Sequence, residues 1–286
     1  MTDSSSIPRG TLAGLLLLLL VTALVYVPGL DGPPLLDDDT VLLPLMEYDP
    51  AAWRDWIGDE ITTGRGQLGR PVAMATFVAN AVLHGNDLWY WKFTNLLVHL
   101  FTGGLVFLLT FQLSGHACRQ DAALARGGLA LLVAGLWLLH PLQVSTVLYT
   151  VQRMAQLSSL FVLAGLLAYV TGRRQQLAGS APGWLPIGLA FVLCFPLAVL
   201  SKESGLLFPF LALLVEVLVF RFAGSRQQRR LLISLFILVA LLPAVAAVAY
   251  SLVNYERFFV AAYESREFTV AERVLTQFRV LLYYLY

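Results

Sequence analysis

The chain has 286 residues, of which 58% are hydrophobic and only 13% are charged, and its mean hydropathy is +0.73. Soluble domains are about 45–50% apolar and about 25% charged, so this composition excludes an ordinary water-soluble globule. The net charge of +1 leaves no basic surface for DNA or RNA, and we expect no nucleic-acid partner.

Long apolar runs follow one another along the chain. A transmembrane helix needs about 20 mainly apolar residues, and such runs must be helical because lipid offers backbone groups no partners. The expected spans are 11–29, 91–113, 127–140, 154–171, 184–200, 205–221 and 231–253, with an eighth starting near 274. The sequence therefore predicts an all-α, polytopic membrane bundle of about 7–8 spans. We expect one domain over 1–286, with a C-terminal remainder missing.

Arginines in short loops favour a cytosolic N-terminus, which makes residues 30–90 a large first extracytoplasmic loop. Within this loop, Ala51–Ile57 is expected to form an interfacial helix. The apolar segment Val72–Leu83 is too short to span and is expected to lie along the membrane surface. Cys118 falls in a loop and Cys194 in a span, so we expect no disulfide between them.

Three consecutive carboxylates, Asp37, Asp38 and Asp39, follow the first span. Adjacent carboxylates repel one another unless a cation or a hydrogen-bond donor offsets their charge. Next to a membrane-embedded site, one of them could deprotonate a hydroxyl nucleophile or hold a divalent metal at a phosphate. The alternative is a solvated acidic turn without chemistry.

Ionisable side chains in or beside spans are costly and point to function. The predicted topology places the aspartates at one membrane level with Arg70, His140, Arg153, Lys202 and Glu203. Cations and acids together suit a site that grips a phosphate and activates a nucleophile. The alternatives are a local ion pair for Lys202 and Glu203, and snorkelling for Arg153 and Lys202.

Two further polar residues lie inside predicted spans. His99 follows Asn95 by one turn and is expected to make an interhelical hydrogen bond rather than to bind a ligand. Glu216 is expected to pair with arginines on the cytosolic side. The chain has no Walker loop and no G-x-G-x-x-G, H-E-x-x-H or G-x-S-x-G motif, so soluble nucleotide chemistry is not expected.

Six short motifs in order resemble one family over nearly the whole chain. They are Leu36-Asp37-Asp38, Gly69-Arg70-Pro71, Trp91-Lys-Phe-Thr-Asn95-Leu-Leu-Val-His99, His140-Pro141-Leu-Gln143, Tyr149-Thr-Val-Gln152-Arg153-Met-Ala-Gln-Leu-Ser-Ser159 and Ser201-Lys202-Glu203-Ser204. The chain resembles the transmembrane and tetratricopeptide-repeat-containing O-mannosyltransferases and their bacterial relatives. The resemblance implies the glycosyltransferase C-type fold.

The resemblance also implies an enzyme that moves a sugar from a polyprenyl-phosphate carrier to an extracytoplasmic acceptor, commonly a protein Ser or Thr hydroxyl. Its partners would be membrane lipid, the lipid-linked sugar and an acceptor protein, and its location the bacterial inner membrane. A divalent metal is optional in this class, with Asp37 and Asp38 as its ligands. The sequence leaves the sugar, the acceptor and the oligomeric state open.

By the same resemblance, Asp38 or Asp37 is the catalytic base, with Asp38 slightly favoured. Residues Arg70, His140, Arg153, Lys202 and Glu203 would hold the donor phosphate or shape the pocket, with secondary roles for Asn95, His99, Tyr149 and Gln152. Two positions depart from the family: Ser145 stands where many relatives have a glutamate, and Asp39 where many have an uncharged residue.

Two other classes of function remain. One is a lipid or ion transporter or flippase, although the chain shows no pseudo-symmetric halves with broken helices. The other is a non-catalytic membrane subunit that retains the fold. The enzyme hypothesis is weakened if neither Asp37 nor Asp38 approaches Arg153 or Lys202 across a cavity open to the lipid.

Overall fold

The computed structural model describes residues 7–38, 41–42, 69–117, 123–179, 182–256, 261–263, 266 and 268–285. These residues are mainly helical, joined by turns and short irregular segments, and contain no strand. The chain divides into two compact units, Met1–Ser225 and Arg226–Tyr286, and each is considered by itself. The expectation of a single domain stays a prediction.

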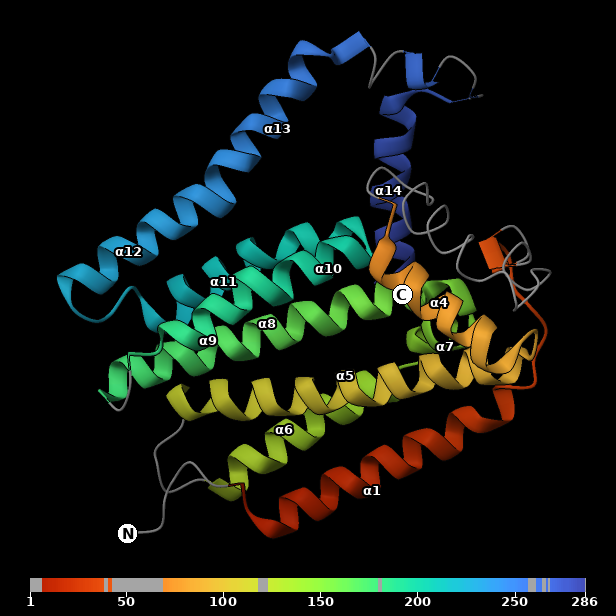
Figure 1. Ribbon diagram of the computed structural model, residues 1–286, viewed down its shortest axis with the longest axis horizontal. Coiled ribbons are helices and arrows are strands. Elements are labelled where there is room, and N and C mark those ends of the chain that lie inside the picture. The colour runs from red at the N-terminus through yellow and green to blue at the C-terminus, as the bar shows by residue number, and fades with distance from the viewer. Residues whose placement is uncertain are drawn as a thin grey trace. The chain divides into compact units, whose positions relative to one another are not determined.

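The first unit contains most of the helices (Figure 1). They are α1 (Arg9–Tyr26), η1 (Val27–Gly29), α4 (Pro71–His84), α5 (Leu88–Ala117), α6 (Ala123–Leu138), α7 (Leu142–Leu148), η3 (Thr150–Gln152), α8 (Arg153–Ala178), α9 (Trp184–Leu189), η4 (Ala190–Cys194), α10 (Phe195–Ser201), η5 (Glu203–Leu207), α11 (Phe208–Val215) and η6 (Glu216–Phe220). The second unit contains α12 (Arg226–Phe236), η7 (Ile237–Leu241), α13 (Leu242–Val253), η9 (Ala261–Tyr263) and α14 (Val270–Leu285).

The membrane-span prediction is confirmed in its main lines. Among the described residues, six helices are long and apolar enough to cross a membrane, or seven if a bent pair counts as one span. The bent pair is α6 and α7, whose axes differ by 65°. The chain is thus a multi-pass membrane protein by the length and composition of its helices. The expected eighth span corresponds to α14, which has 16 residues.

Two wide helical turns have a cause in the sequence. The π-helical segments η4 and η7 come directly before Pro196 and Pro243. A proline inside a helix has no N–H to donate, and its ring clashes with the carbonyl four residues earlier. Here that carbonyl lies in the π-helical turn, so the helix widens instead of breaking. Each of these helices therefore continues through its proline as one span.

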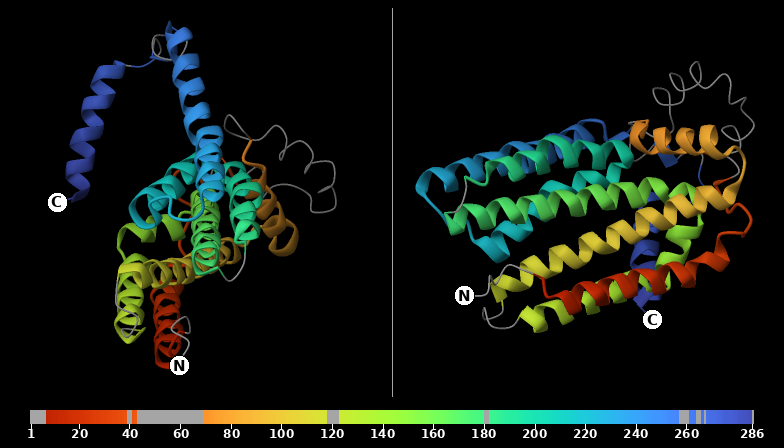
Figure 2. Two further views of the ribbon diagram at one scale, coloured as in Figure 1. Left: turned by 90° about the vertical axis from the view of Figure 1, so that its left-hand side faces the viewer. Right: turned by 60° about the horizontal axis from the view of Figure 1, so that its bottom comes forward.

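Helix α5 is central in the first unit, where it packs against α1, α6 and α8. Figure 2 shows α1, α5 and α6 lying along one another. Close approach of α5 and α6 depends on Gly103, because a Cβ there would overlap the side chain of Leu138. Small residues at such contacts are how helices pack tightly in lipid.

The short apolar segment predicted at 72–83 forms α4. Its inner side chains Met74 and Phe77 are fully buried against Trp91 and Leu157, and the rings of Phe77 and Trp91 stack 6.0 Å apart. α4 thus packs on α5, α8 and α10. The helix expected at 51–57 lies outside the described residues.

Candidate functional site

The carboxylate of Asp38 is buried and fully engaged by backbone N–H groups. Its Oδ1 accepts from Val151 at 2.8 Å, and its Oδ2 accepts from Thr150 at 3.2 Å and Leu35 at 3.1 Å. The side chain is only 2% exposed. The first N–H groups of a helical segment lack intrahelical partners, and Asp38 supplies these partners where η3 leads into α8. Asp38 therefore ties the chain after α1 to the beginning of α8.

Asp37 is exposed, in contrast to its neighbour. Its backbone N–H donates to the hydroxyl of Tyr149 at 3.0 Å, and the same hydroxyl hydrogen-bonds the Asp37 carboxylate. Burial raises the pKa of Tyr149, and the neighbouring Asp37 raises it further. Tyr149 thus stays a neutral phenol that positions Asp37 while solvent still reaches the carboxylate.

Arg153 is completely buried, and protein oxygens surround its guanidinium. It donates to Asn95 Oδ1 at 2.8 Å, to the carbonyl of Thr76 at 3.0 Å and to that of Trp91 at 2.7 Å. Its guanidinium also lies 4.5 Å from the centre of the Phe77 ring. Arg153 joins α4, α5 and α8 and presents no surface to a ligand.

The amide of Asn95 completes this network. Its Nδ2 donates to the carbonyls of Val147 at 3.1 Å and Thr150 at 3.2 Å. Asp38 and Arg153 are therefore connected through Thr150 and Asn95, that is, through protein atoms and not across a cavity. This pair belongs to the frame of the site. Neither of the two cavities described below is lined by Asp37, Asp38, Arg153 or Lys202, so the approach across a cavity that would favour an enzyme is not seen in them.

One cation at this end was missed by the sequence argument. Lys92 is 1% exposed, and its Nζ donates to the carbonyls of Gly32 and Pro33, at 2.5 and 2.9 Å. It fixes the chain between α1 and Asp38. The sequence signal was a lysine at the second residue of the predicted span 91–113, because an ionisable side chain is costly in lipid unless its charge is used.

Arg70 pairs with Glu203 across 133 residues of sequence. Arg70 Nη2 lies 3.0 Å from Glu203 Oε2, and Nε lies 3.2 Å from both carboxylate oxygens. Arg70 Nη1 also contacts the sulfur of Met154 at 3.2 Å, which places the pair beside the first turn of α8. Both side chains remain about a quarter to a third exposed, at 26% and 33%.

Lys202 has no hydrogen-bond partner for its ammonium within the described part of the chain. Burial lowers its pKa, Arg70 lowers it further, and Glu203 partly opposes both. Its carbonyl accepts from Ser158, at 3.5 Å. Lys202 is therefore a half-buried cation near the beginning of α8 whose ammonium makes no hydrogen bond to the described residues.

As the pH rises, Lys202 is expected to lose its affinity for an anion at a lower pH than an ordinary lysine would, whose pKa is about 10.4. The lowered pKa of Lys202 means that the ammonium is lost before that value is reached. Between the two pKa values the unfolded chain binds more protons, so stability should rise with pH while affinity falls. Titrating inorganic phosphate or a phospholipid headgroup from pH 7 to 11 measures the affinity.

The matched control is Lys202→Arg, which keeps its charge throughout this range. Its affinity should stay flat where that of the unmodified chain falls. Parallel curves for the two proteins would show that Lys202 does not hold the anion.

The other predicted residues lie nearby in different roles. His140 is exposed at the bend between α6 and α7, where its Nδ1 accepts from the N–H of Leu142 at 3.2 Å. Ser145, the position of the absent glutamate, is exposed on α7. Gln152 lies at the end of η3, and Asp39 lies outside the described residues.

His99 makes the interhelical hydrogen bond that was expected, from Nε2 to the carbonyl of Leu138 at 2.9 Å. Its ring stacks on that of Trp137, with 4.7 Å between centroids. His99 also lines a cavity of about 460 Å³ between α5, α6, α7, α8, η5 and α11. It is the only predicted site residue among the described residues that line this cavity.

A second hollow is almost wholly apolar. It has a volume of about 680 Å³ and is lined by α1, α5 and α8, with Leu19, Phe101, Leu105 and Leu160 among its residues. Phe101 is 70% exposed. A hydrocarbon chain can lie here without meeting a charged group.

The residues present do not suit a resident metal ion. Among the described residues, no group of three or more His, Cys, Asp or Glu is placed to hold one. The two proposed ligands differ, since Asp37 is exposed while both oxygens of Asp38 already accept backbone N–H groups. We derive no step through a metal.

At the opposite end of α8 lies a buried ion pair. Arg173 Nε is 2.8 Å from Glu216 Oε2, and neither side chain is exposed. Glu216 also accepts from Tyr169 at 2.6 Å and from the N–H of Phe222 at 3.1 Å. The predicted pairing of Glu216 with an arginine is confirmed for Arg173.

Comparisons of the chain with protein-family models, with curated proteins and with solved structures found no match.

Proposed function

We propose that the chain is an integral membrane glycosyltransferase of the C-type fold that moves a sugar from a polyprenyl-phosphate carrier to an acceptor hydroxyl. One observation carries the proposal. A buried network of Asp38, Asn95 and Arg153 holds the beginning of α8. The exposed Asp37 contacts Tyr149 just before this helix, the partly exposed pair of Arg70 and Glu203 lies beside Met154, and Lys202, whose ammonium has no hydrogen-bond partner among the described residues, lies beside Ser158. An accessible carboxylate and accessible cations held in place are what this transfer needs.

The roles follow from exposure and from existing partners. Asp37 takes the proton of the acceptor hydroxyl, whose oxygen forms a bond to C1 of the sugar. The bond between C1 and the phosphate oxygen breaks, and its electron pair leaves with the polyprenyl phosphate. Lys202 stabilises the charge on that phosphate. The ion pair of Arg70 and Glu203 shapes the surface beside it. Asp38 and Arg153 position these groups, and His140 lies at the rim.

The carrier has a matching surface in the apolar hollow between α1, α5 and α8. A prenyl chain is already out of water in the bilayer, so the hollow would hold it by van der Waals packing rather than by the hydrophobic effect. Helix α8 lines the hollow and also begins beside the charged residues Asp37, Arg70, Lys202 and Glu203. The tail and the head group of one carrier molecule could therefore both contact α8.

The orientation belongs to the proposal as well. Arginines of the short loops place the N-terminus in the cytosol, which puts the end with Asp37 and Lys202 on the extracytoplasmic side. The location proposed is the bacterial inner membrane, and the acceptor proposed is a Ser or Thr hydroxyl of an extracytoplasmic protein.

A second candidate function is transport of a lipid or small solute. It is favoured by the uncharged cavity inside the first unit and by the π-helical turns in two apolar helices. Proteoliposomes separate the two functions, because a transporter moves its substrate without changing it, whereas a transferase makes a new glycosidic bond.

The test uses the chain in proteoliposomes with polyprenyl-phosphate mannose or glucose and a Ser/Thr-rich peptide. We expect a peptide mass increase of one hexose that depends on the protein. Mass spectrometry of extracytoplasmic proteins with and without the gene would identify the natural sugar and acceptor. No hexose on any acceptor in either experiment would refute the transferase proposal.

A further inference from the structure

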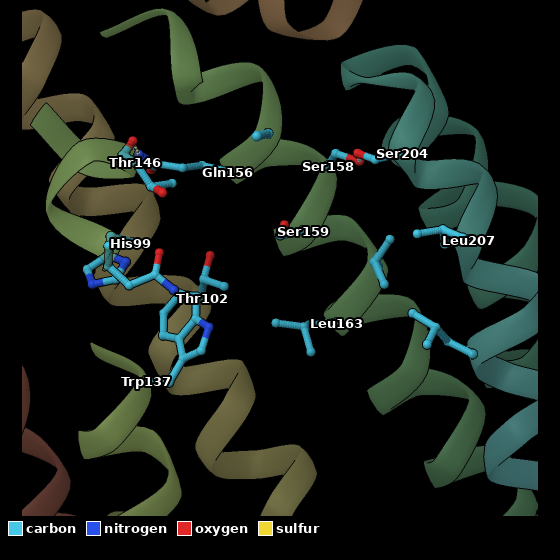
Figure 3. A pocket seen from close by; sticks show the side chains of 14 residues that line it. His99, Thr102, Trp137, Thr146, Gln156, Ser158, Ser159, Leu163, Ser204 and Leu207 are labelled. Carbon is cyan, nitrogen blue, oxygen red and sulfur yellow. Dashed lines mark hydrogen bonds between the residues drawn. The ribbon is translucent and has the colours of Figure 1, made fainter. Parts of the chain in front are cut away.

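The cavity between α5 and α8 differs in character from the charged end of the first unit. None of the described residues that line it is an aspartate, glutamate, lysine or arginine. Its polar groups are hydroxyls and amides, together with the rings of His99 and Trp137. Figure 3 shows His99, Thr102 and Trp137 on one side, with Ser159 and Leu163 of α8 across from them.

One buried atom in the cavity wall lacks a hydrogen-bond partner. Gln156 is 5% exposed, and its Nε2 donates to the carbonyl of Thr146 at 2.5 Å. Its Oε1 is buried and has no hydrogen-bond partner among the described residues. A buried acceptor left unsatisfied costs free energy until a donor reaches it. Figure 3 shows Gln156 extending from α8 to Thr146 at the upper edge of the cavity.

Other groups of the wall can also bond to a ligand. Because Nε2 of His99 bonds to a carbonyl, it carries the hydrogen and leaves Nδ1 as an acceptor. The hydroxyl of Ser159 has no partner among the described residues and is exposed to the cavity. Acceptors and hydroxyls thus occur together on walls that carry no charge.

The volume and the lining restrict the occupant. At about 460 Å³ the cavity lies within the range of about 300–1,000 Å³ typical of ligand sites. A charged head group would be desolvated here without a counter-charge, which is costly. Most of the wall is apolar, with the indole of Trp137 and the side chains of Val162, Leu163, Leu207 and Leu211, whereas Gln156, Ser159 and His99 carry its polar groups. A neutral molecule with several hydroxyls satisfies both.

We infer that this cavity binds the uncharged, polyhydroxylated head of an amphiphile, such as a neutral hexose on a hydrocarbon tail. Its identification as a sugar rests on the proposed function, whereas the preference for an uncharged head with hydroxyl donors rests on the cavity alone. Hexuronic acids are excluded by the same walls, and so is a phosphate inside the cavity. The phosphate of the proposed donor would have to lie outside it, toward Lys202, whose carbonyl contacts the lining residue Ser158.

The test compares three probes that share one tail: octyl mannoside, octyl glucuronide and 1-octanol. Binding to the full chain in nanodiscs is measured by native mass spectrometry. We expect the mannoside to bind at least 10-fold more tightly than 1-octanol, and the glucuronide no more tightly than 1-octanol. Equal binding of all three, which a merely water-filled cavity would give, overturns the inference.

Variants connect the preference to the cavity wall. Gln156→Leu should reduce the ratio of octyl mannoside affinity to 1-octanol affinity at least fivefold and leave 1-octanol binding unchanged. Ser159→Ala, which removes a hydroxyl with no structural partner, should reduce it about threefold. Gln112→Leu is the matched control, because Gln112 pairs with Thr171 and does not line the cavity.

If Gln156→Leu does not fold, Ser159→Ala decides the matter alone, and a full mannoside advantage in Ser159→Ala overturns the inference. A mannoside preference in a chain that transfers no sugar would keep the inference and refute the transferase. Sugar transfer by a chain that shows no preference for the mannoside would refute the inference about the cavity and keep the transferase.

Discussion

Replacing Asp37 by asparagine is expected to reduce sugar transfer by about 10²–10⁴-fold, the usual contribution of a general base. The side chain is exposed and contacts the hydroxyl of Tyr149, so the fold should survive the change. Transfer from a polyprenyl-phosphate hexose in proteoliposomes measures the loss. Thermal unfolding of the same sample should give an unchanged midpoint.

Asp38→Asn is the matched control, since it makes the same chemical change one residue further on. Its effect should be on stability, because the carboxylate oxygens accept three backbone N–H groups in a buried site. The asparagine amide keeps one oxygen as an acceptor, but its NH₂ group is a donor and cannot accept a hydrogen bond from a backbone N–H. We expect a loss of about 2–4 kcal/mol. Abolished transfer at full stability in Asp38→Asn, with active Asp37→Asn, would transfer the role of base to Asp38.

Glu216→Leu is expected to cost about 3–5 kcal/mol of stability, because it leaves the buried guanidinium of Arg173 without its counter-charge. Three further donors hydrogen-bond the carboxylate of Glu216: the hydroxyl of Tyr169, the backbone N–H of Phe222 and Nη2 of Arg173. Chemical or thermal unfolding in detergent measures the difference.

The double variant Arg173→Met with Glu216→Leu tests whether the loss comes from the unpaired charge. Removing both charges should leave the protein more stable than Glu216→Leu alone, because an apolar pair can replace a buried ion pair at little cost. Losses that simply add would show that the two side chains act independently.

The sequence was sufficient to predict where the apolar helices run. The expected spans 184–200 and 205–221 correspond to Trp184–Ser201 and Glu203–Phe220, because the length of an apolar run is a local property that the bilayer thickness determines. The third and fourth expected spans, 127–140 and 154–171, leave a short connection between them. In the structure α7 and η3 form this connection.

The partners of the charged residues could not be predicted in the same way. Lys202 and Glu203 are adjacent, so a local ion pair was one reading, yet Glu203 pairs with Arg70. Which side chain meets which depends on how helices far apart in the sequence pack. The same holds for Gln156 and Ser159, whose cavity carries no charge and so gives no signal in a search for ionisable groups.

The buried carboxylate of Asp38 also has a consequence for biogenesis. Its partner Thr150 lies 112 residues further along the chain. At about 5–20 residues per second of synthesis, Asp38 waits about 6–22 s before that segment exists. During this interval the charge must remain in water, so the segment after α1 completes its fold only after the helices up to α8 have been inserted.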